Sequence, residues 1–270
     1  MNITFSTCWY VFKAKFDVNT YMGWIDKFLS NIESFYLVVY TDLRGIQCFQ
    51  KYFNNPNIKF IIKPMENFYN YLYKDFWIEN HKKNMNLNKI TDWRVNMLWS
   101  EKIHFVNETI EKQYFSETKM YAWCDIGYFR NDETSVTRDQ MKIWPNKEKI
   151  EKMDTNKIYY AVVTHNQIYL NQMMHFINIK NRYGVPSRPI PPDQVTISGG
   201  FFVLHKSKME WWKKTYDEKL QAYFKNNYLV KDDQIILADC IFTKETMNNF
   251  LLLFNKEKED DWFLFQKTLL

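Results

Sequence analysis

The first 65 residues alternate between short apolar runs and segments with helical spacing, and this alternation constrains the fold more than any other feature. Ile3 to Thr7 alternates with β-forming side chains, while Phe35 to Tyr40 and Ile58 to Ile62 are apolar runs of strand length. A second, shorter helix is expected at about 46–53. The first helix carries one apolar stripe, at Tyr21, Trp24, Ile25, Phe28, Leu29 and Ile32. This β-α-β-α-β pattern predicts a parallel sheet with helices on both faces, which binds ligands beyond the carboxyl ends of its strands.

The rest of the chain continues the alternation less regularly. Residues 66–98 show no clear period and predict irregular helices and loop, 131–157 is charged and rich in turn formers, and the four prolines in 182–193 predict a surface loop. The expected elements are a helix at 99–113, strands at 120–124, 158–163 and 195–204, helices at 207–224 and from about 232, and a strand at 250–254. Because no linker or repeat interrupts them, we expect a single α/β domain over residues 1–270 with a mixed, mainly parallel sheet.

Composition narrows the class of ligand. Aromatic residues make up 19% of the chain, which predicts a large aromatic core or a site lined with rings. The formal charge of +5 is small, and lysines are spread evenly among Asp and Glu. Because proteins that bind nucleic acid usually cluster their basic residues on one face, we expect no nucleic-acid partner. A small anionic ligand such as a nucleotide fits this charge better.

The spacing of the cysteines and the lengths of the apolar segments indicate the compartment in which the protein is expected. Cys8, Cys48, Cys124 and Cys240 are widely spaced, which predicts neither a zinc site nor a disulfide framework. No segment approaches 18 consecutive apolar residues, and the first 15 residues lack the pattern of a signal peptide. We therefore expect a cytoplasmic protein with reduced thiols and no transmembrane segment.

The strongest candidate for chemistry is Asp125, which directly follows the apolar strand at 120–124. A carboxylate at the carboxyl edge of a sheet can hold a divalent ion that bridges the phosphates of a nucleotide, and Arg130 could reach the same phosphates. Alternatively, Asp125 caps the next turn and Arg130 is solvated, which is about equally consistent with these residues alone.

Two further segments are candidates for ligand binding or catalysis. Gly199 and Gly200 stand in a β-branched and aromatic run, where they permit either close approach to a ligand or a bulge that serves only the sheet. Asp232 and Asp233 open a helix, where one could act as a general base, although capping of the helix explains an acidic pair without catalysis. No glycine-rich dinucleotide or phosphate loop and no nucleophile elbow is present in the sequence.

The order of these segments is that of a GT-A nucleotide-sugar glycosyltransferase. More narrowly, the chain resembles the WlaTC/HtrL glycosyltransferase family from Ile3 to about Phe254, and the Trp-x-Asp-x-Gly-x-x-Arg stretch from Trp123 to Arg130 is the most specific part. The other matching segments are Tyr40-Thr41-Asp42, Trp99-Ser100-Glu101-Lys102, Gly199-Gly200-Phe201-Phe202 and Asp232-Asp233-Gln234.

The resemblance implies a role for each matching segment. Residues 1–130 would form the nucleotide-binding half and 131–270 the acceptor half. Asp125 would hold Mn²⁺ or Mg²⁺ against the donor diphosphate, although Gly127 replaces the second Asp of the usual Asp-x-Asp element. Asp233, or else Asp232, would take the proton of the acceptor hydroxyl. The donor would contact Thr7, Asp42, Lys102, Arg130, Gly199 and Gly200.

The expected function is accordingly the transfer of a sugar from a nucleotide diphosphate sugar, by preference a UDP-sugar, to a carbohydrate or glycoconjugate acceptor. The main alternative is a noncatalytic carbohydrate- or nucleotide-binding protein on the same scaffold. A metal-dependent phosphoesterase is a third interpretation, but such enzymes usually need more metal ligands than these segments supply.

Overall fold

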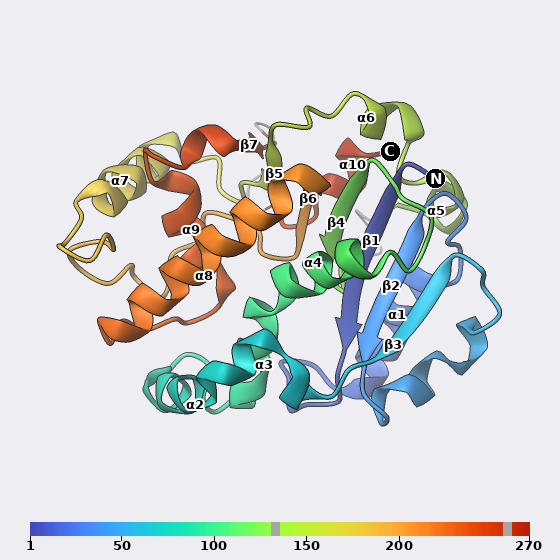
Figure 1. The fold of residues 1–270 in the computed structure, drawn as a ribbon, viewed down its shortest axis with the longest axis horizontal. Helices are drawn as coiled ribbons and strands as arrows, with labels where there is room; N and C mark the ends of the chain where they lie inside the picture. Colours follow the sequence, from blue (N-terminus) through green and yellow to red (C-terminus); the bar gives the residue numbers. More distant parts are fainter. Residues whose placement is uncertain (131–135, 256–260) are drawn as a thin grey trace.

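The core of the molecule is a seven-stranded sheet in the order β3-β2-β1-β4-β6-β5-β7 (Figure 1). The computed structural model describes residues 1–130, 136–255 and 261–270. Of the strands described, β6 alone is antiparallel to its two neighbours, and all other pairs are parallel. The strands are β1 (Ile3–Trp9), β2 (Tyr36–Thr41), β3 (Ile58–Ile62), β4 (Met120–Cys124), β5 (Ile158–Ala161), β6 (Phe201–His205) and β7 (Phe250–Leu253).

Helices cover both faces of the sheet, and each face buries its own hydrophobic cluster. One cluster includes residues of α2 (Lys74–Lys83), α3 (Trp93–Ser100), α4 (Lys102–Lys112), α7 (Gln167–Asn178), α8 (Met209–Lys225) and α9 (Asp233–Phe242). The other includes residues of α1 (Val18–Leu29), α5 (Arg138–Ile143), α6 (Lys147–Glu151) and α10 (Leu264–Thr268). Short 3₁₀ helices are η1 (Gly45–Tyr52), η2 (Met65–Asn67), η3 (Tyr69–Tyr73), η4 (Lys206–Lys208) and η5 (Met247–Asn249).

Side chains alternate between the two faces along each strand, and helices cover both faces. A central strand such as β4 is therefore apolar throughout. In β4, Tyr121 and Trp123 belong to the cluster beside α4, whereas Ala122 and Cys124 belong to the cluster beside α1. Every residue of β1 and β4 is buried, as expected for central parallel strands covered on both sides. The predicted fold class, an α/β domain with a mixed, mainly parallel sheet and helices on both faces, is therefore confirmed.

Three local predictions need correction. The strand expected at 195–204 begins only at Phe201, because the chain turns at Gly199 and Gly200 before it enters β6. The helix expected at 46–53 is the 3₁₀ helix η1. Within the segment predicted to be turn-rich, residues 131–135 lie outside the described residues, and the others include two short helices, α5 and α6, with loops and turns around them. A capping box between Thr137 and Gln140 begins α5, and the Asn146 side chain caps α6.

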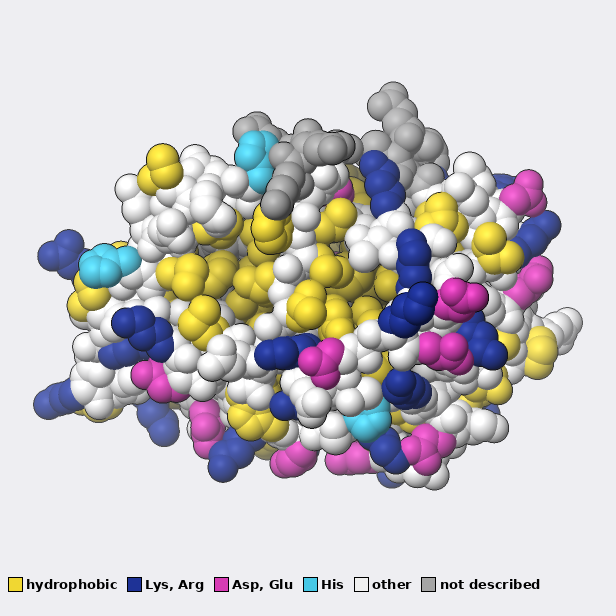
Figure 2. All heavy atoms as spheres, turned by 90° about the horizontal axis from the view of Figure 1, so that it is seen from above, with side chains coloured by type: hydrophobic (Ala, Val, Ile, Leu, Met, Phe, Trp, Pro, Cys, Tyr) yellow, Lys and Arg dark blue, Asp and Glu magenta, His cyan; other side chains and the backbone are white. Residues whose placement is uncertain are grey.

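Not all hydrophobic side chains enter the core. The three leucines of the edge strand β7, Leu251 to Leu253, remain partly exposed. Figure 2 shows a face on which hydrophobic side chains gather near the centre, with charged side chains mainly around them. None of the helices that the structure describes combines the length and the apolar character needed to cross a membrane.

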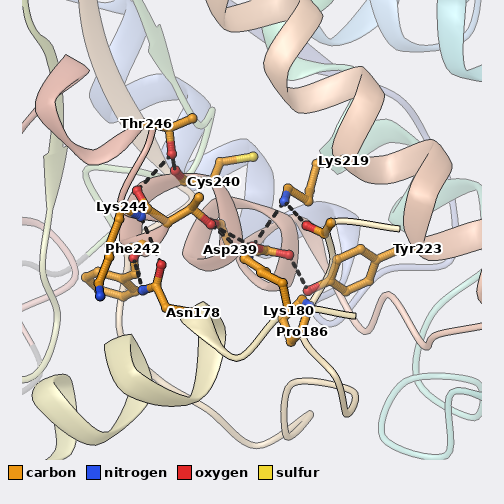
Figure 3. A network of polar contacts seen from close by, with 12 residues as sticks. Asn178, Lys180, Pro186, Lys219, Tyr223, Asp239, Cys240, Phe242, Lys244 and Thr246 are labelled. Carbon is orange, nitrogen blue, oxygen red and sulfur yellow. Dashed lines mark hydrogen bonds and ion pairs between the residues drawn. The ribbon is translucent and has the colours of Figure 1, made fainter. Parts of the chain in front are cut away.

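A buried carboxylate anchors α9, the helix that begins at the acidic pair (Figure 3). Asp239 is fully buried, and Lys180 and Lys219 form ion pairs with it. Tyr223 of α8 donates a hydrogen bond to its second oxygen at 3.0 Å, and the Thr243 hydroxyl donates at 3.0 Å to the first. These contacts tie α9 to α8 and to the chain after α7, so they fix the direction in which the helix presents its N-terminus.

We predict that Asp239→Ala lowers the free energy of unfolding by about 3–5 kcal/mol, because it leaves lysine ammonium groups without their buried partner. Urea denaturation followed by circular dichroism would measure the loss. The control is Glu210→Ala, which removes an exposed ion pair with Lys213 on α8 and should change stability by about 1 kcal/mol or less. Equal losses in the two variants would show that the Asp239 network contributes little.

Candidate functional site

A cavity of about 300 Å³ opens at the carboxyl ends of β1 and β4, the edge at which parallel sheets bind ligands. Its walls come from the β1–α1 loop, α3, the start of α4, the segment after β4, the turn before β6, the start of α9 and residues near 262. The cavity thus takes residues from both predicted halves of the chain. Its lining includes the aromatic residues Trp9, Tyr10, Phe12, Phe16, Tyr21, Trp24, Trp99, Trp123, Tyr128, Trp262 and Phe263.

Asp125 leaves the end of β4 and points into this cavity. Its backbone N–H donates to the Gly200 carbonyl at 2.9 Å, which links the end of β4 to the start of β6. The Trp123 indole N–H donates to Asp125 Oδ1 at 2.6 Å and so orients the carboxylate. The side chain keeps 39% of its surface exposed, so Asp125 can contact a ligand in the cavity.

Lys102 is buried between two carboxylates that are far apart in the sequence. Its Nζ lies 3.1 Å from Asp125 Oδ1 and 3.0 Å from Asp233 Oδ2, and it donates to the Gly199 carbonyl at 2.8 Å. Burial alone lowers the pKa of Lys102, but the charges of Asp125 and Asp233 outweigh burial and hold the pKa above its ordinary value. Lys102 therefore stays charged and joins α4, β4 and α9 at one point.

The residue before this lysine fixes the start of α4. Glu101 is fully buried and accepts hydrogen bonds from the backbone N–H groups of Tyr69 and Asn70, at 2.7 and 2.9 Å. Burial raises the pKa of Glu101, although these donors oppose the rise. Glu101 thus holds the 3₁₀ helix η3 against the start of α4, whereas Lys102, the next residue, lines the cavity.

Space, rather than backbone conformation, disfavours a side chain at Gly199 and leaves little room for one at Gly200. A Cβ added to Gly199 would lie 2.7 Å from Asp233 Oδ2, and one added to Gly200 would lie 3.3 Å from Asp125 Oδ2. Neither glycine has a positive φ. The sequence left open an approach of the backbone to a ligand or a bulge at this pair, and in the structure the groups that approach it are the two carboxylates.

The acidic pair at the start of α9 lines the cavity, and neither side chain is the cap that the alternative interpretation expects. Asp232 stands at the N-cap position without a side-chain capping hydrogen bond, and its Oδ2 pairs with Lys231 at 3.0 Å. Its Oδ1 is buried and has no hydrogen-bond partner among the described residues. Burial raises the pKa of Asp233 to about 6, while the charge of Lys102 opposes that rise.

Two cations lie at the exposed side of the cavity. Lys15, in the loop between β1 and α1, places its Nζ 5.1 Å from the centre of the Trp99 ring. Arg130 lies over Phe263 and Trp24, with its guanidinium carbon 5.0 and 5.6 Å from the ring centres. Arg130 belongs to a recognisable sequence motif, whereas Lys15 could not be predicted, because the loop of residues 10–17 has neither periodicity nor a motif.

Thr7 and Asp42, which the resemblance assigns to the donor, do not line the cavity. Thr7 lies one residue before the first lining residue of β1, fully buried. The Asp42 carboxylate accepts hydrogen bonds from the backbone N–H groups of Arg44 and Gly45, at 3.0 and 2.7 Å, and so stabilises the turn into η1.

The residues present would not by themselves hold the Mn²⁺ or Mg²⁺ ion that the resemblance implies, and most of its ligands would have to be oxygens of the donor diphosphate and of water. Such an ion needs several oxygen ligands. Within residues 1–130, 136–255 and 261–270, no three His, Cys, Asp or Glu side chains lie close enough together to hold a metal ion. Asp125 and Asp233, which face each other, already share the Lys102 ammonium group.

Comparison with known proteins supports the fold. No protein-family model matches the chain, and no curated protein matches it in sequence. Among solved structures, the chain is similar to mouse xyloside xylosyltransferase 1 in its apo form, with a TM-score of 0.50 and 11% identity over 94% of this chain and 85% of that chain. The chain therefore has a fold like that of a glycosyltransferase, and at this identity the likeness extends to the fold alone.

We predict that Lys102→Met lowers the free energy of unfolding by about 3–5 kcal/mol at pH 7.5, because two carboxylates then face each other without a buried cation. The loss should be smaller at pH 5, since the folded variant would bind protons on these carboxylates more tightly than the unfolded chain does. Urea denaturation at both pH values tests this, with the exposed Lys112→Met in the same helix as control. An equal loss at both pH values would contradict the electrostatic explanation.

Proposed function

We propose that this protein is a glycosyltransferase that moves a sugar from a nucleoside diphosphate sugar, by preference a UDP-sugar, to a hydroxyl of a carbohydrate or glycoconjugate acceptor. The observation that carries the proposal is the convergence of Asp125, Asp232 and Asp233 with Lys102 in one aromatic cavity at the carboxyl edge of the sheet. The similarity of the fold to a xylosyltransferase supports the same class.

The cavity offers the interactions that such a donor needs. Flat faces of Trp and Tyr suit the stacking of a nucleobase and of sugar rings, and cations at the exposed side suit a diphosphate. The free Oδ1 of Asp232 suits a sugar hydroxyl, because a buried carboxylate oxygen without a hydrogen-bond donor is costly. We assign Asp232 to holding the sugar.

In the reaction, the bond between the anomeric carbon and the phosphate oxygen breaks, and the nucleoside diphosphate leaves with the electron pair. The acceptor oxygen forms the new bond to the anomeric carbon and loses its proton. We assign that proton to Asp233, because its pKa of about 6 makes it a stronger base than an exposed aspartate and still leaves it ionised at neutral pH. The charge of Lys102 keeps Asp233 ionised before the transfer.

The first test is incubation with a panel of nucleotide sugars and acceptor saccharides, with released nucleotide and product mass as readouts. We expect one donor to release its nucleoside diphosphate in an acceptor-dependent way, and Asp125→Asn to reduce that release without unfolding the protein. The exposed Asp139→Asn is the control. Binding of a nucleotide sugar without turnover would instead favour the noncatalytic binding protein, and release of phosphate would favour a phosphoesterase.

A second prediction separates the two members of the acidic pair. Asp233→Asn should lower kcat by about 10²–10⁴, the usual contribution of a general base, with nearly unchanged donor affinity. Asp232→Asn should mainly raise the KM for the donor sugar.

In the unmodified protein kcat/KM should rise with pH to a plateau, with a midpoint near 6, since Asp233 accepts a proton only when ionised. A profile that keeps this limb in Asp233→Asn would remove Asp233 from the role.

A further inference from the structure

The ammonium group of Lys102 has no hydrogen left for a ligand. A lysine carries three N–H donors, and those of Lys102 meet the oxygens of Asp125, Asp233 and Gly199 at 3.1, 3.0 and 2.8 Å. Its single positive charge is also more than offset by the two carboxylates. Lys102 is therefore an internal counter-ion of the site and is not placed to bind the phosphates of a donor.

Each carboxylate of the site is also already paired. Asp125 and Asp233 share Lys102, and Asp232 pairs with Lys231. A divalent cation between Asp125 and Asp233 would have to compete with the buried ammonium group for both carboxylates. The arrangement thus satisfies the carboxylates with lysine at the position where a metal would be expected.

Two cations in the cavity remain without such a partner. No carboxylate of the described residues forms an ion pair with Lys15 or Arg130, and both side chains are exposed to solvent and held against aromatic rings. Both line the same cavity. Partial burial lowers the pKa of Lys15, the charge of Asp232 opposes that effect, and the charge of Arg130 lowers it further.

We infer that Lys15 and Arg130, in place of a divalent metal ion, bind the diphosphate of the donor, an inference that rests on the proposed function. Their two positive charges match the two negative charges of a nucleoside diphosphate ester. The guanidinium of Arg130 can donate two parallel hydrogen bonds to phosphate oxygens, and Lys15 supplies a second positive charge from the β1–α1 loop. Because a neighbouring positive charge is unfavourable for each of them, an anion between them relieves their repulsion.

The test is calorimetric titration with UDP, GDP, ADP and dTDP in the presence of EDTA and, separately, of Mn²⁺. We expect one nucleoside diphosphate to bind with the same affinity, within about threefold, in both conditions, and more weakly at higher salt. Lys15→Gln and Arg130→Gln should each weaken it about tenfold, the loss expected for a charge-assisted hydrogen bond. Lys15→Arg should retain binding, because it keeps the charge.

The matched control is Lys13→Gln, since Lys13 lies in the same loop but donates to the Lys89 carbonyl and does not line the cavity. This variant should bind as the unmodified protein does. Binding that requires Mn²⁺, or that survives both Lys15→Gln and Arg130→Gln, would overturn the inference and leave the proposed function intact. If no nucleoside diphosphate and no nucleotide sugar binds under either condition, the proposed function itself fails.

Discussion

The site depends on one buried cation. Lys102 at the start of α4 holds Asp125 from the end of β4 and Asp233 from the start of α9, and it also donates to the backbone at Gly199. Without it, the buried Asp233 and the partly exposed Asp125 would repel each other, which would favour protonation of Asp233. Glu101 on one side and the Asp239 network on the other fix the two helices that meet at this ion pair. Lys102 therefore determines both the electrostatics of the cavity and the way in which α4, β4 and α9 meet.

The sheet could be predicted from the sequence because its central strands are buried on both faces, so that β2 and β4 are apolar runs and β1 is a run of β-forming residues. The start of β6 could not, since β-forming residues precede Gly199 and nothing local shows that carboxylates occupy the space beside it. Helices α5 and α6 are too short to show a period, and only the caps at Thr137 and Asn146 mark them.

The candidate site was predictable in part, for a related reason. Asp125 and the acidic pair could be named because each stands at the end of a recognisable element. The pairing of these charges could not be predicted, because Lys102 and Asp233 are distant in sequence and meet only through the fold. The sequence alone does not show that two carboxylates and a backbone carbonyl already occupy the N–H groups of Lys102. Lys15 carries no local signal at all, since its importance comes from the absence of an ion pair with any carboxylate in the described part of the chain.

The missing side chain at position 199 has a consequence for any redesign of this cavity. Because a methyl group there would occupy the volume that the Asp233 carboxylate fills, positions 199 and 233 share a single space. Enlarging one residue is compatible with the present backbone only if the other becomes smaller. A variant library that changes either position singly will therefore report on steric conflict, whereas paired changes of conserved total volume can report on chemistry.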